Sequence, residues 1–297
     1  MNQPDPALLA RLPRPFRDEP FRLLRKGVHD SDTTLVYINR NDDFAFLAPL
    51  PDIDYRQYRT RKEALGLAAY QPGLAAAQAS LEKFRPVVAA AGSLLEVGAG
   101  DAPFLTAVRQ TFPTLALASL EVDQLTKPFR DAVPGLRQYE DFTEIKAEGR
   151  RFDCVVLLHV LEHILEPALF LDHIKAVLAP GGVVVIEVPS LADPLLSLLA
   201  PGGVAAYRRF FFQLQHPYSY SPSSLVRLLE SHGFAAREVF AHQRYGLENH
   251  LTWLGESRPG GNPLLQQVFA GCDQAYRADL ERSGHADTVI VVAAAGG

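Results

Sequence analysis

Cysteine is scarce in this chain of 297 residues, which contains only Cys154 and Cys272. Cys154 lies inside an apolar run, and the two residues suggest neither a disulfide framework nor a metal cage. We therefore expect a cytoplasmic protein without a metal site.

Long apolar runs and long basic runs are missing as well. No stretch reaches the roughly 18 uninterrupted apolar residues that a membrane span needs, and no apolar segment of signal-peptide length precedes Arg11. The net charge is −5, and the one basic cluster, Arg56, Arg59, Arg61 and Lys62, is interpreted as a solvated helix start. Because phosphate contacts need clustered Lys and Arg, we expect no binding to nucleic acid. The lack of long apolar runs leads us to expect a soluble protein that does not bind a membrane.

The most informative segment is residues 94–101, where an apolar strand breaks into a glycine turn just before a helix. Gly98 and Gly100 let the backbone bend sharply and let a ligand approach main-chain N–H groups, and the helix N-terminus adds positive charge. Pro103 occupies the third glycine position of a dinucleotide fingerprint, which argues against NAD or FAD. Glu96 would repel a pyrophosphate but can bind an ammonium group, so we expect a ligand that is cationic here.

A second acid ends the next predicted strand, residues 115–121. A carboxylate at this position, Glu121, can accept hydrogen bonds from two ribose hydroxyls. The alternative is a solvated acid at a strand end. Its position after the glycine turn favours the nucleoside role.

The central part of the chain alternates apolar runs with helical patterns, which predicts a parallel sheet with a ligand crevice at the carboxyl ends of its strands. The predicted strands are 94–98, 115–121, 136–140, 152–158 and 182–188, with closing strands at 235–241 and 287–294; the predicted helices are 103–111, 124–132, 167–178 and 222–232.

The N-terminal part has a different pattern. Residues 1–30 are rich in Pro and Arg, which predicts an extended arm or irregular cap, and residues 33–47 predict a hairpin. A helical stretch at about 60–90 is interrupted by a Pro-Gly pair. We predict a cap over residues 1–69 and a nucleotide-binding domain over 70–297.

Four motifs, in order along the chain, resemble those of the class I S-adenosylmethionine-dependent methyltransferases. They are Glu-Val-Gly-Ala-Gly at 96–100, Ser-Leu-Glu-Val-Asp at 119–123, the run at 152–163 that ends in Leu-Glu-His, and Leu-Ala-Pro-Gly-Gly at 178–182. The last two are similar to those of small-molecule and glycan methyltransferases. The chain departs from the family where Ala102 and Pro103 replace the third turn glycine, which leaves open how the methionine end is held.

The resemblance implies an α/β fold with a Rossmann-like, seven-stranded sheet that is mostly parallel with an antiparallel last strand and has helices on both faces. It also implies S-adenosylmethionine as cofactor and S-adenosylhomocysteine as product. The cofactor-binding residues expected from it are Glu96, Gly98, Gly100, Glu121, Val122, Asp141, Phe142 and His159.

Two insertions are expected to shape the acceptor site, at about 190–221 and 243–285. Both combine aromatic and polar side chains, which suit an acceptor pocket, although Phe210, Phe211 and Phe212 could equally pack a lid onto the core. The substrate-binding candidates are Tyr218, Phe212, Tyr245, Asn249 and His250.

Methyl transfer to a hydroxyl requires alignment of the acceptor and a base within hydrogen-bond reach. His216, His159 and His163 are the candidates, because the pKa of an imidazole, about 6.5, suits this role. His216 is preferred, since His159 and His163 could equally hold the turns in which they lie.

We therefore predict methylation of a hydroxyl on a sugar, a glycan precursor or a natural product. The alternatives are N- or C-methylation of a small molecule, a non-catalytic subunit that binds the cofactor, and an NAD-dependent oxidoreductase. A homodimer is left open.

Overall fold

The computed structural model describes residues 3–51, 53, 73–199 and 204–296. The basic cluster at 56–62, the first part of the predicted helical stretch at 60–90 and the predicted boundary at 69/70 lie outside the described residues.

Seven strands form the main sheet, in the spatial order β10-β11-β8-β7-β4-β5-β6. Their bounds are Ser93–Val97 for β4, Ala116–Leu120 for β5, Arg137–Tyr139 for β6, Phe152–Leu158 for β7, Leu178–Pro189 for β8, Phe234–His242 for β10 and Thr288–Ala295 for β11. β4 pairs in parallel with β5 and β7, and β5 with β6. The sheet is mostly parallel with one antiparallel end and is flanked by helices, which confirms the predicted fold class.

Contacts divide the chain into two compact units. The first unit consists of residues 1–51, 161–168 and 187–292, and the second of residues 52–160, 169–186 and 293–297.

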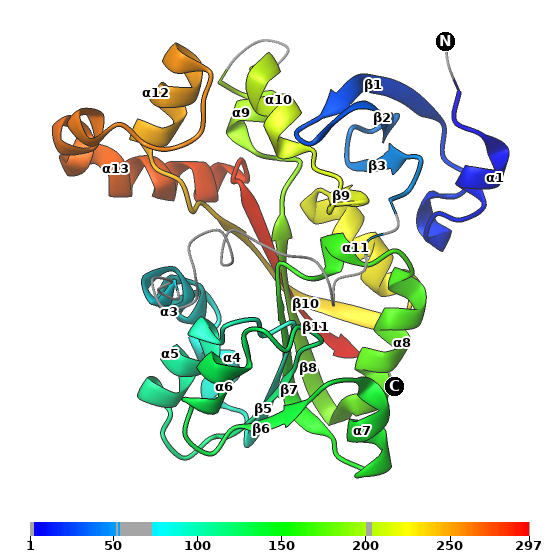
Figure 1. The fold of residues 1–297 in the computed structure, drawn as a ribbon, viewed down its shortest axis with the longest axis vertical. Helices are drawn as coiled ribbons and strands as arrows, with labels where there is room; N and C mark the ends of the chain where they lie inside the picture. Colours follow the sequence, from blue (N-terminus) through cyan, green and yellow to red (C-terminus); the bar gives the residue numbers. More distant parts are fainter. Residues whose placement is uncertain (1–2, 52, 54–72, 200–203, 297) are drawn as a thin grey trace. The chain divides into compact units, whose positions relative to one another are not determined.

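The second unit carries the glycine turn and the strands that flank it. Its helices are α3 (Leu74–Lys83), α4 (Arg85–Ala89), α5 (Pro103–Thr111), α6 (Lys127–Asp131), α7 (Phe142–Ala147) and most of α8 (Pro167–Val177) (Figure 1). Proline suits the first turn of α5, because an N–H group there would have no partner within the helix. The buried face of α5 consists of Phe104, Leu105, Ala107 and Val108.

A second, antiparallel sheet lies in the first unit, in the order β1-β2-β3-β9 (Figure 1). The strands are Phe21–Val28, Ser31–Asn39, Phe44–Ala48 and Tyr218–Tyr220, and the short helices α1 (Pro6–Leu9) and η1 (Arg14–Phe16) precede them. The predicted hairpin is confirmed as β2 and β3. The prediction of irregular structure over residues 1–30 was wrong for β1, whose register shifts at two places, so its buried side chains do not alternate.

The two predicted insertions are largely helical. The first contains α9 (Pro194–Ser197), α10 (Ala205–Phe211) and β9, and the second contains α12 (Leu247–Glu256) and α13 (Pro263–Ser283). A hydrophobic cluster in the first unit joins Phe211, Phe212 and Trp253 to Val36 and Ile38 of β2. Phe211 and Phe212 therefore pack in this cluster, as the alternative interpretation expected, and whether Phe212 also binds an acceptor stays a prediction.

The helix α11 (Pro222–Ser231) and the 3-10 turn η3 (Leu161–His163) complete the elements. In the part of the chain that the structure describes, no helix combines the length and apolar character needed to cross a membrane.

Candidate functional site

The glycine turn of the second unit adopts left-handed backbone conformations, which glycine accommodates without strain. Gly98 has φ +75 and Gly100 has φ +50, and Ala102, just before α5, is also left-handed. The Gly98 N–H donates to the carbonyl of Leu120 at 2.8 Å. A Cβ on Gly98 would lie 2.5 Å from Cγ2 of Val160, so both the conformation and the space require glycine here.

Glu121 follows β5 directly and is 8% exposed. Its Oε2 accepts a hydrogen bond from the Gly100 N–H at 2.6 Å, and its Oε1 accepts one from the Asp123 N–H at 2.8 Å. The carboxylate is therefore fixed beside the glycine turn. Because each carboxylate oxygen has a second lone pair, it can still accept hydrogen bonds from a ligand.

Arg130 is a buried residue of this site that the sequence analysis missed. Its guanidinium donates from Nη1 to the Gly100 carbonyl at 2.7 Å and from Nη2 to the Asp123 carbonyl at 2.9 Å. Arg130 thus donates to carbonyls of the same two segments whose N–H groups donate to Glu121. No short sequence motif indicates it, because it contacts Gly100, which lies 30 residues earlier in the chain.

Glu96, near the end of β4, is 3% exposed. Its Oε2 has no hydrogen-bond partner among the described residues. Burial, together with the nearby carboxylates of Glu121 and Asp101, raises the pKa of Glu96 well above 4.5. A cationic ligand would supply the missing partner and stabilise the ionised carboxylate, as the sequence analysis expected.

We expect Glu96→Gln to stabilise the cofactor-free protein at neutral pH. The native pKa is raised, so the protein loses stability as the pH rises from 4.5, where the unfolded carboxyl ionises, towards the native pKa. Glutamine carries no titrating group, so the difference between the variant and the wild type should vanish near pH 4.5. Urea unfolding between about pH 5 and about pH 8 measures this. A variant less stable than the wild type throughout would contradict the assignment.

The remaining predicted cofactor residues of the second unit lie at strand ends. Asp141 caps α7, with Oδ1 accepting hydrogen bonds from the N–H groups of Thr143 at 2.6 Å and Glu144 at 3.1 Å. Phe142 stacks on the ring of His173, with centroids 5.2 Å apart. Val122 and His159 are partly buried, and His159 has φ 55. Their roles in cofactor binding stay predictions.

Two of the three candidate histidines come together in the first unit. The rings of His163 and His216 lie 4.7 Å apart between centroids, edge to face. The Nδ1 atom of His163 is hydrogen-bonded to the Gln215 carbonyl at 2.7 Å. His159 belongs to the second unit.

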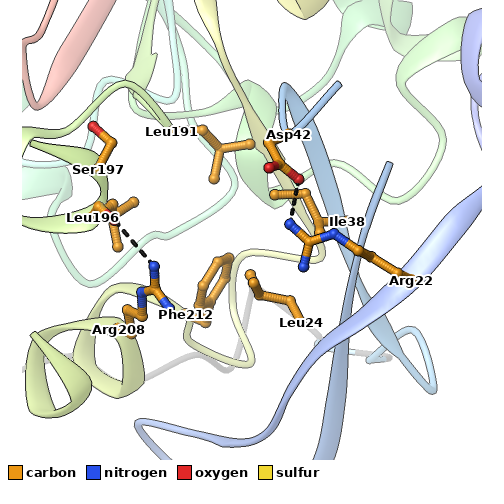
Figure 2. Close-up of a pocket in the computed structure, with 9 residues that line it drawn as sticks. All are labelled: Arg22, Leu24, Ile38, Asp42, Leu191, Leu196, Ser197, Arg208 and Phe212. Atoms are coloured by element: carbon orange, nitrogen blue, oxygen red, sulfur yellow. Dashed lines mark hydrogen bonds and ion pairs between the residues drawn. The ribbon is translucent and has the colours of Figure 1, made fainter. Parts of the chain in front are cut away.

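Phe212 lines a pocket of about 290 Å³ in the first unit (Figure 2). Apolar side chains, including Ile38 and Leu191, form part of its wall, and Arg22 and Arg208 contribute guanidinium groups. Arg22 pairs with Asp42 at 2.5 Å. This pocket offers an acceptor both apolar contact and cationic groups.

Tyr218, another substrate-binding candidate, is fully buried in β9. Its hydroxyl donates to the Leu165 carbonyl at 3.1 Å, and burial raises its pKa to about 12. The hydroxyl thus joins β9 to the segment that follows η3.

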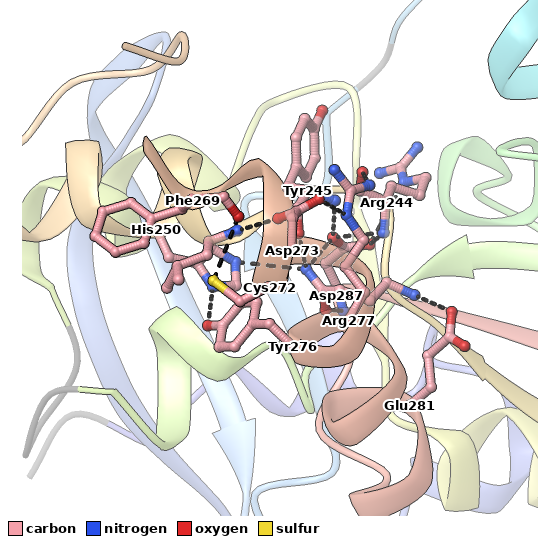
Figure 3. Close-up of polar contacts among 12 residues, drawn as sticks. Arg244, Tyr245, His250, Phe269, Cys272, Asp273, Tyr276, Arg277, Glu281 and Asp287 are labelled. Atoms are coloured by element: carbon pink, nitrogen blue, oxygen red, sulfur yellow. Dashed lines mark hydrogen bonds and ion pairs between the residues drawn. The ribbon is translucent and has the colours of Figure 1, made fainter. Parts of the chain in front are cut away.

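Polar residues of the second insertion, among them Tyr245 and His250, take part in polar contacts around α12 and α13 (Figure 3). His250 is 2% exposed, its Nδ1 lies 2.6 Å from the hydroxyl of Tyr276, and burial lowers its pKa to about 4. His250 is therefore neutral at pH 7. Tyr245 is 48% exposed, and the N–H of the partly buried Asn249 donates to the Gly246 carbonyl at 3.2 Å. The roles of these residues in substrate binding stay predictions.

The fold and the glycine turn define a class I methyltransferase. The family described as methyltransferase domain matches residues 67–239, more than half of the chain, and the chain belongs to this family. It is an S-adenosylmethionine-dependent enzyme, as the sequence resemblance implied.

One solved structure shares this fold, and a second is similar to part of the chain. An S-adenosylmethionine-dependent methyltransferase from Archaeoglobus fulgidus is 17% identical, with a TM-score of 0.50 over 74% of this chain and 94% of that chain. The amino pentose methyltransferase CalS10 from Micromonospora echinaspora is 25% identical, with a TM-score of 0.35 over 46% of this chain and 59% of that chain. No curated protein sequence matches this chain.

Proposed function

We propose that this enzyme transfers a methyl group from S-adenosylmethionine to a hydroxyl group of a small molecule such as a sugar, a glycan precursor or a natural product. The observation that carries the cofactor half is the buried carboxylate of Glu96, which has an oxygen without a partner among the described residues, beside the turn that Glu121 holds. These two carboxylates accept hydrogen bonds and therefore fit an ammonium group and a ribose, which donate them.

The residues have distinct tasks in this proposal. Glu96 binds the ammonium group of the methionine end, and Glu121 accepts hydrogen bonds from the ribose hydroxyls. The cofactor supplies an electrophilic methyl group on sulfur. The protein then has to orient the acceptor hydroxyl and exclude water, and alignment alone can contribute about 7 kcal/mol.

A histidine accepts the proton of the acceptor hydroxyl. His216 is preferred, with His163 and His159 as the other candidates, and the acceptor is proposed to contact Phe212, Tyr218, Tyr245, Asn249 and His250. The pocket beside Phe212 supports an acceptor that is partly apolar and carries groups able to bind arginine.

Calorimetric titration with S-adenosylhomocysteine, with NAD as the control ligand, tests the cofactor half. Binding of the first ligand alone is expected. The rate of S-adenosylhomocysteine formation is then measured with pairs of acceptors, one an alcohol and the other an amine, that share one carbon skeleton. Turnover of amines alone would replace the O-methylation proposal with N-methylation, and cofactor binding without turnover of either acceptor would overturn the proposed acceptor class.

For an acceptor that turns over, we expect His216→Ala to lower kcat by about 100-fold or more, the range for loss of a general base. The affinity for S-adenosylhomocysteine should stay unchanged, because the proposed cofactor residues are Glu96 and Glu121. His232→Ala is the matched control, since that ring contacts Ser231 and the Leu228 carbonyl within its own helix end. An unchanged kcat in His216→Ala would remove His216 from the mechanism.

A further inference from the structure

One carboxylate and two imidazoles converge in the first unit. One candidate ligand atom from each of Glu162, His163 and His216 lies within 4.8 Å of the others. Glu162 is buried, whereas both histidines are partly buried. A small ion at the centre of this cluster could therefore contact all three groups with modest side-chain movement.

The hydrogen bond of His163 favours metal binding at this cluster. Its Nδ1 atom is 2.7 Å from the Gln215 carbonyl, so Nδ1 carries the proton and Nε2 has the lone pair. Histidine ligands of metal ions commonly donate their other ring N–H to a carbonyl, which fixes the tautomer and the ring orientation. The residue that accepts this bond directly precedes His216, so one contact orders both imidazole segments.

A second contact holds the same two segments together. Glu162 and His163 lie in η3, while His216 precedes β9, far away in the sequence. The Tyr218 hydroxyl donates to the Leu165 carbonyl at 3.1 Å and thereby ties β9 to the residues that follow η3. The protein itself thus brings the donors together, which reduces the entropy cost of binding an ion.

We propose that Glu162, His163 and His216 bind one divalent transition-metal ion, of which zinc is the representative. Two imidazoles and a carboxylate suit zinc and its neighbours in the first transition series, and three protein ligands leave a coordination position for water or an acceptor hydroxyl. This proposal revises the expectation of no metal site, which rested on cysteine spacing alone.

A metal ion bound at this cluster would change the role of His216 in the proposed function. As a ligand, His216 would act through the ion. The ion rather than a free imidazole would then increase the acidity of the bound hydroxyl, whose proton would pass to solvent water. This consequence rests on the proposed O-methylation, whereas the metal site does not. The test therefore measures metal binding in the absence of cofactor and acceptor, so its failure is distinguishable from failure of the proposed function.

Full-length protein without a histidine tag, stripped by a chelator, is titrated with Zn²⁺ by calorimetry and with Co²⁺ by visible absorption. One ion per chain is expected, with cobalt bands typical of a site with nitrogen and oxygen ligands. His163→Ala and His216→Ala should each weaken binding on the order of 100-fold or more, beyond the range for loss of a supporting residue. His232→Ala should bind as the wild type does.

His216→Cys separates a ligand role from a structural role. A thiolate can replace imidazole as a ligand, so this variant should retain Co²⁺ and gain a thiolate-to-cobalt charge-transfer band that the wild type lacks. Thermal unfolding followed by circular dichroism establishes that each variant is folded. If the wild type binds no more ion than the His163→Ala, His216→Ala double variant, hydrogen bonds alone hold the cluster and the proposal is overturned.

Discussion

Replacement of Glu121 by alanine is expected to weaken S-adenosylhomocysteine binding by about 1.5–3 kcal/mol, which is roughly tenfold to 150-fold. The variant loses the proposed acceptor for the ribose hydroxyls. It also loses the hydrogen bonds from the N–H groups of Gly100, at 2.6 Å, and Asp123, at 2.8 Å, so part of the effect would come from a displaced glycine turn.

Glu121→Gln separates these two contributions. The carboxamide keeps the shape of the side chain and one accepting oxygen, so it can still hold one of the two N–H groups but has no charge for the ribose. We expect an affinity between those of the wild type and the alanine variant. Calorimetry gives the affinities, and urea unfolding without ligand reports damage to the turn.

Glu140→Ala is the matched control for Glu121→Ala. Glu140 also follows a strand directly, β6, but its side chain is exposed. Its removal should leave the affinity for S-adenosylhomocysteine and the free energy of unfolding equal to those of the wild type within experimental error. If Glu121→Ala behaves in the same way, Glu121 is a solvated acid, and the assignment of the second strand as a nucleoside-binding element is wrong.

The sequence was sufficient to predict the main sheet, because its central strands, such as β4 and β7, contain short apolar runs bounded by turns. Val155, Val156 and Leu157 are fully buried in β7, as their unbroken apolar run predicts. β1 was missed because its register shifts break the two-residue period on which strand prediction depends. β9 was missed since its three residues are too few to show a period, although Tyr218 and Tyr220 are both fully buried.

The site could be predicted only where its chemistry is local in the sequence. Gly98, Gly100 and Glu96 lie within one strand and turn, so their spacing carries the signal. Arg130 contacts the glycine turn because the fold places α6 next to the end of β4. No short sequence motif indicates this contact. The pairing of His163 with His216 likewise depends on β9 joining a sheet built from the N-terminal segment.

Gly98→Ala is expected to have the largest effect on stability, about 2–5 kcal/mol of unfolding free energy. Two terms contribute: an alanine at φ +75 is strained by about 1–2 kcal/mol, and its Cβ would lie 2.5 Å from Cγ2 of Val160. Relief of that overlap must displace the turn, so S-adenosylhomocysteine binding should fall below detection in a standard titration. Urea unfolding and calorimetry measure the two effects.

Gly149→Ala provides the control for backbone strain alone. Gly149 has φ +65, and a Cβ there would meet nothing within 4 Å, so the variant should lose only about 1–2 kcal/mol and bind the cofactor product normally. Val160→Ala added to Gly98→Ala removes the overlapping methyl group but leaves the strained φ. We expect this double variant to recover stability to about the level of Gly149→Ala. A double variant no more stable than Gly98→Ala would mean that the backbone conformation, and not the contact with Val160, makes glycine necessary in the turn.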